Sequence, residues 1–559
     1  MMYSVKGRKR LFNLAAGTVL TMSLWAPLLA QADETQDLRK KVDELQKTLD
    51  DVDKRLNKAE MHTATDKLSL GVDFRTEADS IHYSDMLFAP SALVGKFFMP
   101  FTNVTDMNSG FNGVNLIQAK QMLAGMKQYN LIPAAEKYDI DNDIIYTSKF
   151  RLNMGAKINN NLSFTSRLAA YKVWGDSSGT KFNQGSLGDV TFDGNTSSLP
   201  HGDTLHLERA YFNYKNQVKT VPINFSLGRR PSTEGPPAEY GLNSLEAGSP
   251  LATIINWQFD GASLSFGLDE MTGVPGAALK FCYGVGFESD WGNSGSLSST
   301  SSVKDVHLFG FITTLFDNDM TSAVFNYAHA SNITDGFTGL TVMPFIVKKE
   351  DKLNAAGTGS DGVNEYYFDT NPGGYISRME PSTNIGDWDA ASMLLRSNLA
   401  NIDMFLAGSW SHTDPSQISQ NPFYELMGQG LLSSNGQLEA HNGYSVYAGV
   451  VIPMPADAKL GIEYNWGSKY WFNFTGAEDS LIASKQAARG QVVETYYIQP
   501  IIEKTFFVKV GAQYFDYAYT GSGSPLGAPV KISEANGMDS LFPVVDKVWN
   551  GYISANVRF

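Results

Sequence analysis

The chain has 559 residues, of which 43% are hydrophobic, 12% aromatic and 18% charged, and its formal net charge is −14. This acidity argues against nucleic acid as a partner, because nucleic-acid binding requires a basic surface. The single cysteine, Cys282, excludes an intramolecular disulfide and a haem-attachment motif within the chain.

Residues 1–32 have the features of a secretory signal peptide. Basic residues cluster between Lys6 and Arg10, an uncharged apolar run extends from Leu11 to Leu29, and Ala30-Gln31-Ala32 forms a small-x-small cleavage site. Beyond this leader no stretch approaches the roughly 20 apolar residues that a membrane-spanning helix needs. A mature chain in a membrane would therefore cross it as strands.

Residues 33–62 carry a heptad pattern that predicts an amphipathic, coiled-coil helix of about three heptads. Its apolar seam, spaced alternately by four and three residues, is Leu38, Val42, Leu45, Leu49, Val52, Leu56 and Ala59. An exposed seam needs a partner, so we expect a homo-oligomer, with a trimer as the favoured form. Docking of the helix on a different protein stays open.

From residue 63 to the C-terminus, polar and apolar residues alternate in one segment after another. Such a strand has one apolar and one polar face, which suits a wall between lipid and water. At a hairpin centred on Asn160, antiparallel pairing joins Ile158 to Leu162 and Phe150 to Ala170, so apolar side chains share one face. The expected fold class is all-β, a transmembrane antiparallel β-barrel over residues 63–559.

Connection lengths predict how the strands are joined. Short connections alternate with long ones, as in outer-membrane barrels, and an even strand count leaves both ends of the barrel on the periplasmic side with the helix. We predict about 16 strands, with 18 as the alternative. Residues 252–269 are taken as one bent strand, although the alternation slips at Asp260-Gly261. The predicted strands are 67–79, 144–158, 161–174, 204–214, 222–230, 252–269, 277–288, 305–316, 321–330, 387–398, 402–412, 443–452, 458–470, 491–502, 505–519 and 547–559.

The last strand alternates up to the final residue, Phe559. This ending resembles the C-terminal assembly signal of Gram-negative outer-membrane barrels, which implies recognition by the barrel-assembly machinery. Three further segments stand out: Leu207–Tyr214, Phe225–Pro237 and Cys282–Ser289. They resemble the marker segments of a porin-like outer-membrane family that is known as a domain of unknown function. The resemblance covers the mature chain and implies a barrel in the cell outer membrane, with the helix in the periplasm, but no substrate.

A closed barrel of 16 to 18 strands encloses an aqueous channel unless a loop fills it. Around Asn160 the polar face places Asn153 opposite Arg167, with Arg151 diagonal to it, which predicts a basic patch. The candidate pore-lining residues are Lys149, Arg151, Asn153, Arg167, Arg230, Glu463, Glu494 and Lys509. This mixture of charges is typical of a selective pore, and the ion preference stays open.

Two long loops, near 80–143 and 331–386, are candidates to fold inward. We favour the first, because its helix-like run at 115–129 has apolar residues that need burial. Asp139, Asp141 and Asp143 resemble the start of a calcium loop, but the glycine at position six and the glutamate at position twelve are missing. A calcium site and an acidic strand entrance both stay open, and we expect no other cofactor.

The eight histidines show no metal-binding spacing. We therefore expect no enzymatic activity. The favoured function is a porin-like outer-membrane channel for passive passage of small hydrophilic solutes or ions. The alternative is a structural sheath or tether, for example a barrel that houses or docks a partner such as a multihaem cytochrome.

Overall fold

The computed structural model comprises two compact units, residues 1–68 and 69–559. The described residues are 41–42, 44–49, 52, 67–88, 114–115, 121, 124–175, 205–244, 248–287, 303–335, 339–342, 345–351, 359–360, 362, 365–370, 376–379, 381–420, 425, 428–433, 436–475, 480–540 and 543–559.

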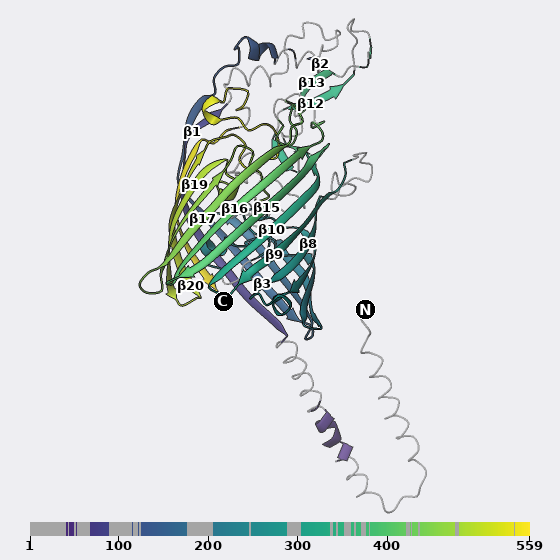
Figure 1. The fold of residues 1–559 in the computed structure, drawn as a ribbon, viewed down its shortest axis with the longest axis vertical. Coiled ribbons are helices and arrows are strands. Elements are labelled where there is room, and N and C mark those ends of the chain that lie inside the picture. Colours follow the sequence, from purple (N-terminus) through teal and green to yellow (C-terminus); the bar gives the residue numbers. More distant parts are fainter. Residues whose placement is uncertain are drawn as a thin grey trace, which may run out of the picture. The chain divides into compact units, whose positions relative to one another are not determined.

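The second unit is a closed barrel of sixteen antiparallel strands, tilted across its wall (Figure 1). Neighbours in sequence are neighbours in the wall, and the ring closes between the first strand and the last. The wall strands are β1 (Leu68–Phe88), β3 (Glu136–Lys157), β4 (Leu162–Val173), β5 (His206–Val218), β6 (Val221–Arg229), β7 (Asp260–Gly267), β8 (Ala278–Phe287), β9 (Val306–Asp317), β10 (Thr321–Thr334), β15 (Asn384–Leu399), β16 (Ile402–Pro415), β17 (His441–Pro453), β18 (Lys459–Gly467), β19 (Gly490–Ile502), β20 (Phe506–Tyr517) and β21 (Lys547–Arg558).

The wall has the opposite polarity to that of a soluble protein. On β18, the apolar Ile462 and Tyr464 are 41% and 38% exposed, whereas Glu463 and Asn465 between and beside them are 1% and 2% exposed. Alternation along each strand puts one set outside and the other inside. An apolar outer surface around a polar interior is the arrangement of a barrel that faces lipid.

The predicted strands and register are largely confirmed. Each of the predicted ranges overlaps one wall strand, so the alternative of eighteen strands is wrong. Around Asn160, Phe150 pairs with Ala170 and Asn153 with Arg167, and the Ile158 amide donates to the Leu162 carbonyl at 3.0 Å. The prediction for 252–269 is wrong in its first half, because β7 begins only at Asp260, where the alternation slips.

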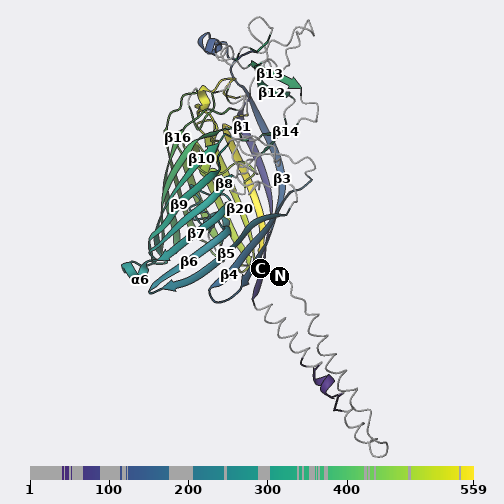
Figure 2. The same ribbon diagram turned by 90° about the vertical axis from the view of Figure 1, so that its right-hand side faces the viewer.

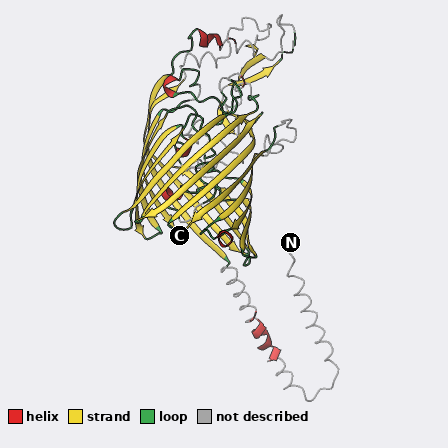
Figure 3. Ribbon diagram, in the orientation of Figure 1, coloured by secondary structure: helices red, strands yellow, loops and turns green. Residues whose placement is uncertain are grey.

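Long loops extend from one rim of the barrel, and short turns join the strands at the other (Figures 2 and 3). The two longest loops form small sheets, β11 (Gly339–Val342) with β14 (Ile376–Met379), and β12 (Phe345–Glu350) with β13 (Glu365–Thr370) and β2 (Val114–Asn115). In the second sheet, Asn115 of the first long loop pairs with Glu365 of the other. The described parts of these loops thus pair with each other. Short helices are α5 (Glu239–Leu242), α6 (Asp269–Thr272), η2 (Lys485–Ala487) and η3 (Ile532–Glu534).

In the first unit, the described residues between 41 and 52 are helical. The four described seam residues, Val42, Leu45, Leu49 and Val52, are between 55% and 68% exposed. Leu38, Leu56, Ala59 and the leader 1–32 lie outside the described residues. No described helix is long and apolar enough to cross a membrane.

Candidate functional site

The connection between β6 and β7, residues 230–259, crosses the inside of the barrel, and we call it the luminal loop. Its Glu239 accepts a hydrogen bond from Arg396 of β15 at 2.8 Å. The Leu251 amide donates to Asn326 of β10 at 3.0 Å. Because its Glu234 contacts β3, β4 and β5, the loop reaches widely separated parts of the wall.

The centre of the loop also reaches β18 and β21. Asn243 accepts a hydrogen bond from Lys459 of β18 at 3.0 Å. Arg558 of β21 donates to the main-chain carbonyls of Asn243, at 2.6 Å, and Leu242, at 3.1 Å. These contacts hold the centre of the loop on β18 and β21.

Glu234 is the centre of the first group of charges, the Glu234 cluster. It forms ion pairs with Arg167 at 3.1 Å and Arg209 at 3.2 Å, and it also accepts a hydrogen bond from Arg151. Glu208 accepts a second hydrogen bond from Arg151, at 2.7 Å. The members of the cluster are Lys149, Arg151, Arg167, Glu208, Arg209 and Glu234. These six residues carry four positive and two negative charges.

A β-bulge explains how two adjacent residues enter this cluster. Arg167 of β4 is opposite Arg209 of β5, but its neighbour Leu168 is opposite Leu207, so Glu208 is an extra residue in the pairing. In a regular strand, Glu208 and Arg209 would point to opposite faces, and a bulge removes that alternation. Both side chains therefore contact Glu234 or its arginine partners.

The surroundings of the luminal loop shift the pKa values of its two acidic side chains in opposite directions. Burial disfavours the Glu234 carboxylate, but the positive charges of Arg151 and Arg167 outweigh it and hold the pKa of Glu234 well below its usual range. For Glu239, burial prevails over the attraction of Arg396 and raises its pKa. Glu234 is thus a firmly ionised anchor.

The connection between β18 and β19, residues 468–489, supplies a second group of charges, the Lys485 cluster. The Lys485 ammonium donates to Glu463 of β18 and, at 2.6 Å, to Glu494 of β19. Lys509 of β20 lies 3.5 Å from Glu494. Tyr447 and Tyr496 donate to Glu463 at 2.6 and 2.9 Å, and Tyr552 donates to Glu494 at 2.6 Å.

The two loops meet inside the barrel in a short main-chain pairing. The amide of Asn256 donates to the Phe474 carbonyl at 2.7 Å, and the amide of Phe474 donates to the Ile254 carbonyl at 3.0 Å. Trp388 of β15 packs beside Phe474 with ring centroids 4.7 Å apart. This part of the lumen is therefore filled by an apolar core, which includes Ile254, Trp257, Ala328, Ala330, Phe472 and Phe474.

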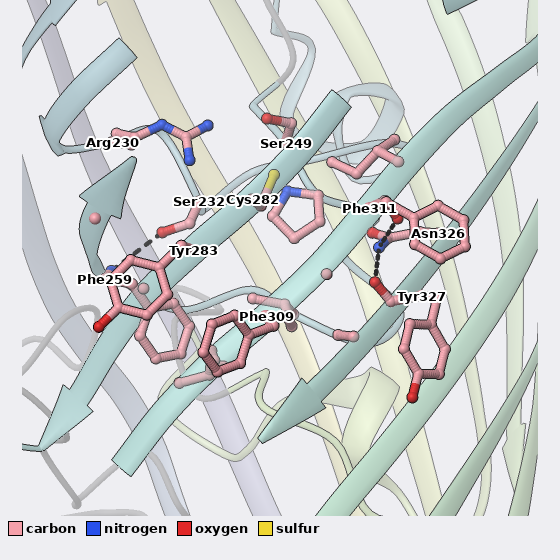
Figure 4. Close-up of a pocket in the computed structure, with 18 residues that line it drawn as sticks. Arg230, Ser232, Ser249, Phe259, Cys282, Tyr283, Phe309, Phe311, Asn326 and Tyr327 are labelled. Carbon is pink, nitrogen blue, oxygen red and sulfur yellow. Dashed lines mark hydrogen bonds between the residues drawn. The ribbon is translucent and has the colours of Figure 1, made fainter. Parts of the chain in front are cut away.

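Arg230 lines a small cavity (Figure 4), and a second cation, Lys280, reaches Ser249 of the same lining. Arg230 donates from Nε to Ser226 at 2.7 Å and from Nη1 to the Ala262 carbonyl at 3.2 Å. Lys280 of β8 donates to Ser249 of the luminal loop at 2.7 Å. The cavity, of about 60 Å³, lies between the luminal loop and β7–β10.

The structure brings the predicted pore-lining residues together in three groups. Lys149, Arg151 and Arg167 belong to the Glu234 cluster, where Asn153 accepts a hydrogen bond from Arg167 at 2.7 Å. Glu463, Glu494 and Lys509 belong to the Lys485 cluster, and Arg230 borders the cavity. Sequence reasoning missed Glu208, Arg209, Glu234, Lys280 and Lys485. Glu208, Arg209 and Glu234 fall in the marker segments Leu207–Tyr214 and Phe225–Pro237, and that was the available signal.

Asp139, Asp141 and Asp143 lie on β3 rather than in a loop. Alternate residues of a strand are about 7 Å apart, so three such carboxylates line up and do not surround one ion. Asp139 accepts a hydrogen bond from the Asp85 amide at 2.9 Å, and Asp141 contacts His82 at 2.6 Å. Among the described residues, no three acidic, histidine or cysteine side chains gather as they would around a metal.

The barrel resembles solved outer-membrane proteins. OmpT of Vibrio cholerae is 9% identical, with 88% of this chain and 99% of that chain covered and a TM-score of 0.38. OprB of Pseudomonas putida is 10% identical, with 90% and 96% covered and a TM-score of 0.38. An anion-selective porin from Comamonas acidovorans is 10% identical, with 88% and 99% covered and a TM-score of 0.39.

No curated protein matches the sequence. A protein family matches residues 139–559, which include fourteen complete wall strands, most of β3 and both charge clusters. The expected resemblance to a porin-like family without an assigned function is thereby confirmed. The chain belongs to the family described as "Protein of unknown function (DUF3373)".

Proposed function

We propose that this protein is an outer-membrane channel for the passive passage of small hydrophilic solutes or ions. The observation that carries the proposal is the closed sixteen-strand wall with apolar residues outside and charged residues inside. A purely structural barrel has no need of so many inward charges. We assign the pore-lining role to Lys149, Arg151, Asn153, Arg167, Arg230, Glu463, Glu494 and Lys509.

The luminal loop supports the channel over a sheath for a protein partner. A polypeptide inside the barrel would have to displace the loop from Arg151, Arg396 and Arg558, which hold it on different parts of the wall. Water and small solutes need only the space beside the loop. We therefore propose that this loop narrows the channel.

Reconstitution in planar lipid bilayers tests the proposal. Purified protein with the leader removed is expected to insert and produce stepwise ionic conductance. The step size should be small for a sixteen-strand barrel, because the luminal loop occupies part of the cross-section. A bilayer that stays closed after insertion has been verified, for example by protease protection, would overturn the channel.

We also propose that the coiled-coil helix joins identical chains on the periplasmic side, as a trimer. The described seam residues are exposed within their unit, so their burial requires another surface. Replacing Leu45 and Leu49 with Asp should lower the mass measured by light scattering in detergent. Replacing the polar Gln46 and Lys47 with Asp is the matched control and should keep the mass. A wild-type monomer, or an unchanged mass in the seam variant, would overturn this assembly.

A further inference from the structure

Arg230 and Lys280 are two inward cations without an acidic partner among the described residues. The recorded acceptors of Arg230 are the Ser226 hydroxyl and the Ala262 carbonyl, and the acceptor of Lys280 is the Ser249 hydroxyl. Arg230 is 9% exposed. The two cations are linked through Ser249, which accepts the hydrogen bond of Lys280 and lines the same cavity as Arg230. Burying like charges together is costly unless an anion compensates them.

These residues contrast with the other charges inside the barrel. Every cation of the Glu234 cluster reaches a carboxylate, and so do Lys485 and Lys509. Arg396 pairs with Glu239. Among the described residues, the buried Arg489 also has no acidic partner, but its guanidinium donates to three main-chain carbonyls. Arg230 differs in lining a cavity, and Lys280 reaches Ser249 in the lining of the same cavity.

The cavity gives an anion a place to bind. Its lining includes Arg230, Ser249, Cys282 and Asn326, and the wall beside it has glycine at 261, 284 and 310. The volume of about 60 Å³ suits a small ion and excludes a bulky solute.

Arg230 and Ser249 line the cavity, and Lys280 lies within hydrogen-bond distance of Ser249. Arg230 keeps its Nη2 group, since its recorded bonds use Nε and Nη1. The Lys280 ammonium uses one of its three hydrogens on Ser249, and that hydroxyl keeps its own hydrogen to donate. Figure 4 shows Arg230, Ser249 and Cys282 among the lining residues. Asn326 has spent its amide hydrogens on main-chain carbonyls of the wall.

We propose that Arg230, Lys280 and Ser249 bind a small oxyanion in this cavity. A planar guanidinium, an ammonium and a hydroxyl match the several acceptor oxygens of a carboxylate or phosphate group. The inference deepens the proposed channel by naming its substrate class, small oxyanions. Binding at the site rests on the residues alone, whereas passage of the bound ion rests on the proposed function.

Inorganic phosphate is the probe for this site. Full-length mature protein, folded in detergent at pH 7 and low salt, is dialysed to equilibrium against radiolabelled phosphate. We expect saturable binding of about one phosphate per chain, weakened about tenfold or more in Arg230→Gln and in Lys280→Gln, because a charge-assisted hydrogen bond is lost. Cys282→Leu keeps both cations but fills the cavity, and it should also weaken binding.

Lys215→Gln is the matched control, because Lys215 is an exposed cation near the short-turn end of β5. It should bind phosphate as the wild type does. The heat-dependent shift of folded barrels in gel electrophoresis confirms that each variant is folded before it is compared. The absence of saturable binding to the wild type, or unchanged binding in the folded Arg230 and Lys280 variants, would overturn the site.

Conductance of the same preparations separates the site from the channel. Phosphate binding that depends on Lys280, in a protein that never conducts, would support the site and overturn the channel. Conductance without phosphate binding would support the channel and overturn the site. If both hold, a gradient of potassium phosphate should give a reversal potential that shifts toward cation preference in Lys280→Gln and stays unchanged in Lys215→Gln.

Discussion

The two charge clusters hold their loops through loop side chains of opposite charge. In the Glu234 cluster, a loop carboxylate enters a wall of lysine and arginine. In the Lys485 cluster, a loop ammonium enters a wall that presents Glu463 and Glu494. Exchanging the loops would bury like charges against each other, at a cost of several kcal/mol. The wall charges therefore select which loop binds where.

The clusters also differ in how completely their charges are compensated. Lys485 and Lys509 balance Glu463 and Glu494, and three tyrosine hydroxyls complete the hydrogen bonds of these carboxylates. The six residues of the Glu234 cluster have two more positive than negative charges. Losing the central residue should therefore be more costly at Glu234 than at Lys485.

The largest expected effect follows from Glu234→Gln. The change leaves four cations around one carboxylate, and removing one partner of a buried ionic network costs about 3–5 kcal/mol. We expect a lower free energy of unfolding in urea and a larger single-channel conductance, because the loop loses its anchor on β3–β5. Glu270→Gln, on the exposed helix α6, is the control that should change neither. An unchanged conductance would mean that this loop does not narrow the channel.

A smaller loss is expected for Lys485→Met. Glu463 and Glu494, which are opposite each other on β18 and β19, then lose the ammonium that they share. Lys509 still pairs with Glu494, and the tyrosines still donate hydrogen bonds to both carboxylates. We expect a cost of about 2–3 kcal/mol in the free energy of unfolding. Lys469→Met is the matched control, because Lys469 contacts only the ring of Tyr470 in the described structure. A loss greater than that of Glu234→Gln would reverse the proposed order of the two anchors.

Arg396→Gln tests the far attachment of the luminal loop. Arg396 is partly exposed, and burial raises the pKa of Glu239, so its ionised form is less favoured. We therefore expect a loss of about 1 kcal/mol in the free energy of unfolding. The double variant with Glu239→Gln should cost little more than either single variant, since the two residues act on each other. Unfolding in urea of the two single variants and the double variant measures this coupling. Additive costs would show that the pair is not an anchor.

The smallest expected effect near neutral pH is the change with pH in the contribution of Glu234 to stability. Because the folded state lowers the pKa of Glu234, its charge adds stability at pH values above the unfolded pKa of about 4.3. That contribution is lost as the pH falls through the lower, folded value. The difference in melting temperature between wild type and Glu234→Gln should stay constant from pH 7 to pH 5 and shrink below pH 4. A difference that disappears already by pH 6 would contradict the lowered pKa.

The wall was predictable because its signals are local. Period-two alternation and a turn at Asn160 fix both the facing of the side chains and their register, and Phe150 pairs with Ala170 as expected. The candidate pore-lining residues follow from the same alternation. The β-bulge at Glu208 was not predictable in this way, because it breaks the period that the prediction used.

The interior was harder to predict because it depends on contacts between distant segments. The apolar run from Leu251 to Phe259 has the composition of a strand, and the structure buries it against inward apolar residues such as Trp388 and Ala330. The rule that inward positions are polar fails where a loop supplies an apolar partner. Loop length favoured 80–143 and 331–386, whereas the loop that crosses the lumen is the shorter 230–259, held by charges rather than by its size.

Arg558 connects the luminal loop to the order in which the chain is made. Its guanidinium lies 3.5 Å from Asp73 of β1 and donates to the carbonyls of Leu242 and Asn243. Arg558 follows all of these partners in the sequence and is therefore synthesised after them. Arg558 thus contacts both the first strand and the luminal loop, so a barrel that closes with the loop out of place lacks the hydrogen bonds from Arg558 to the loop.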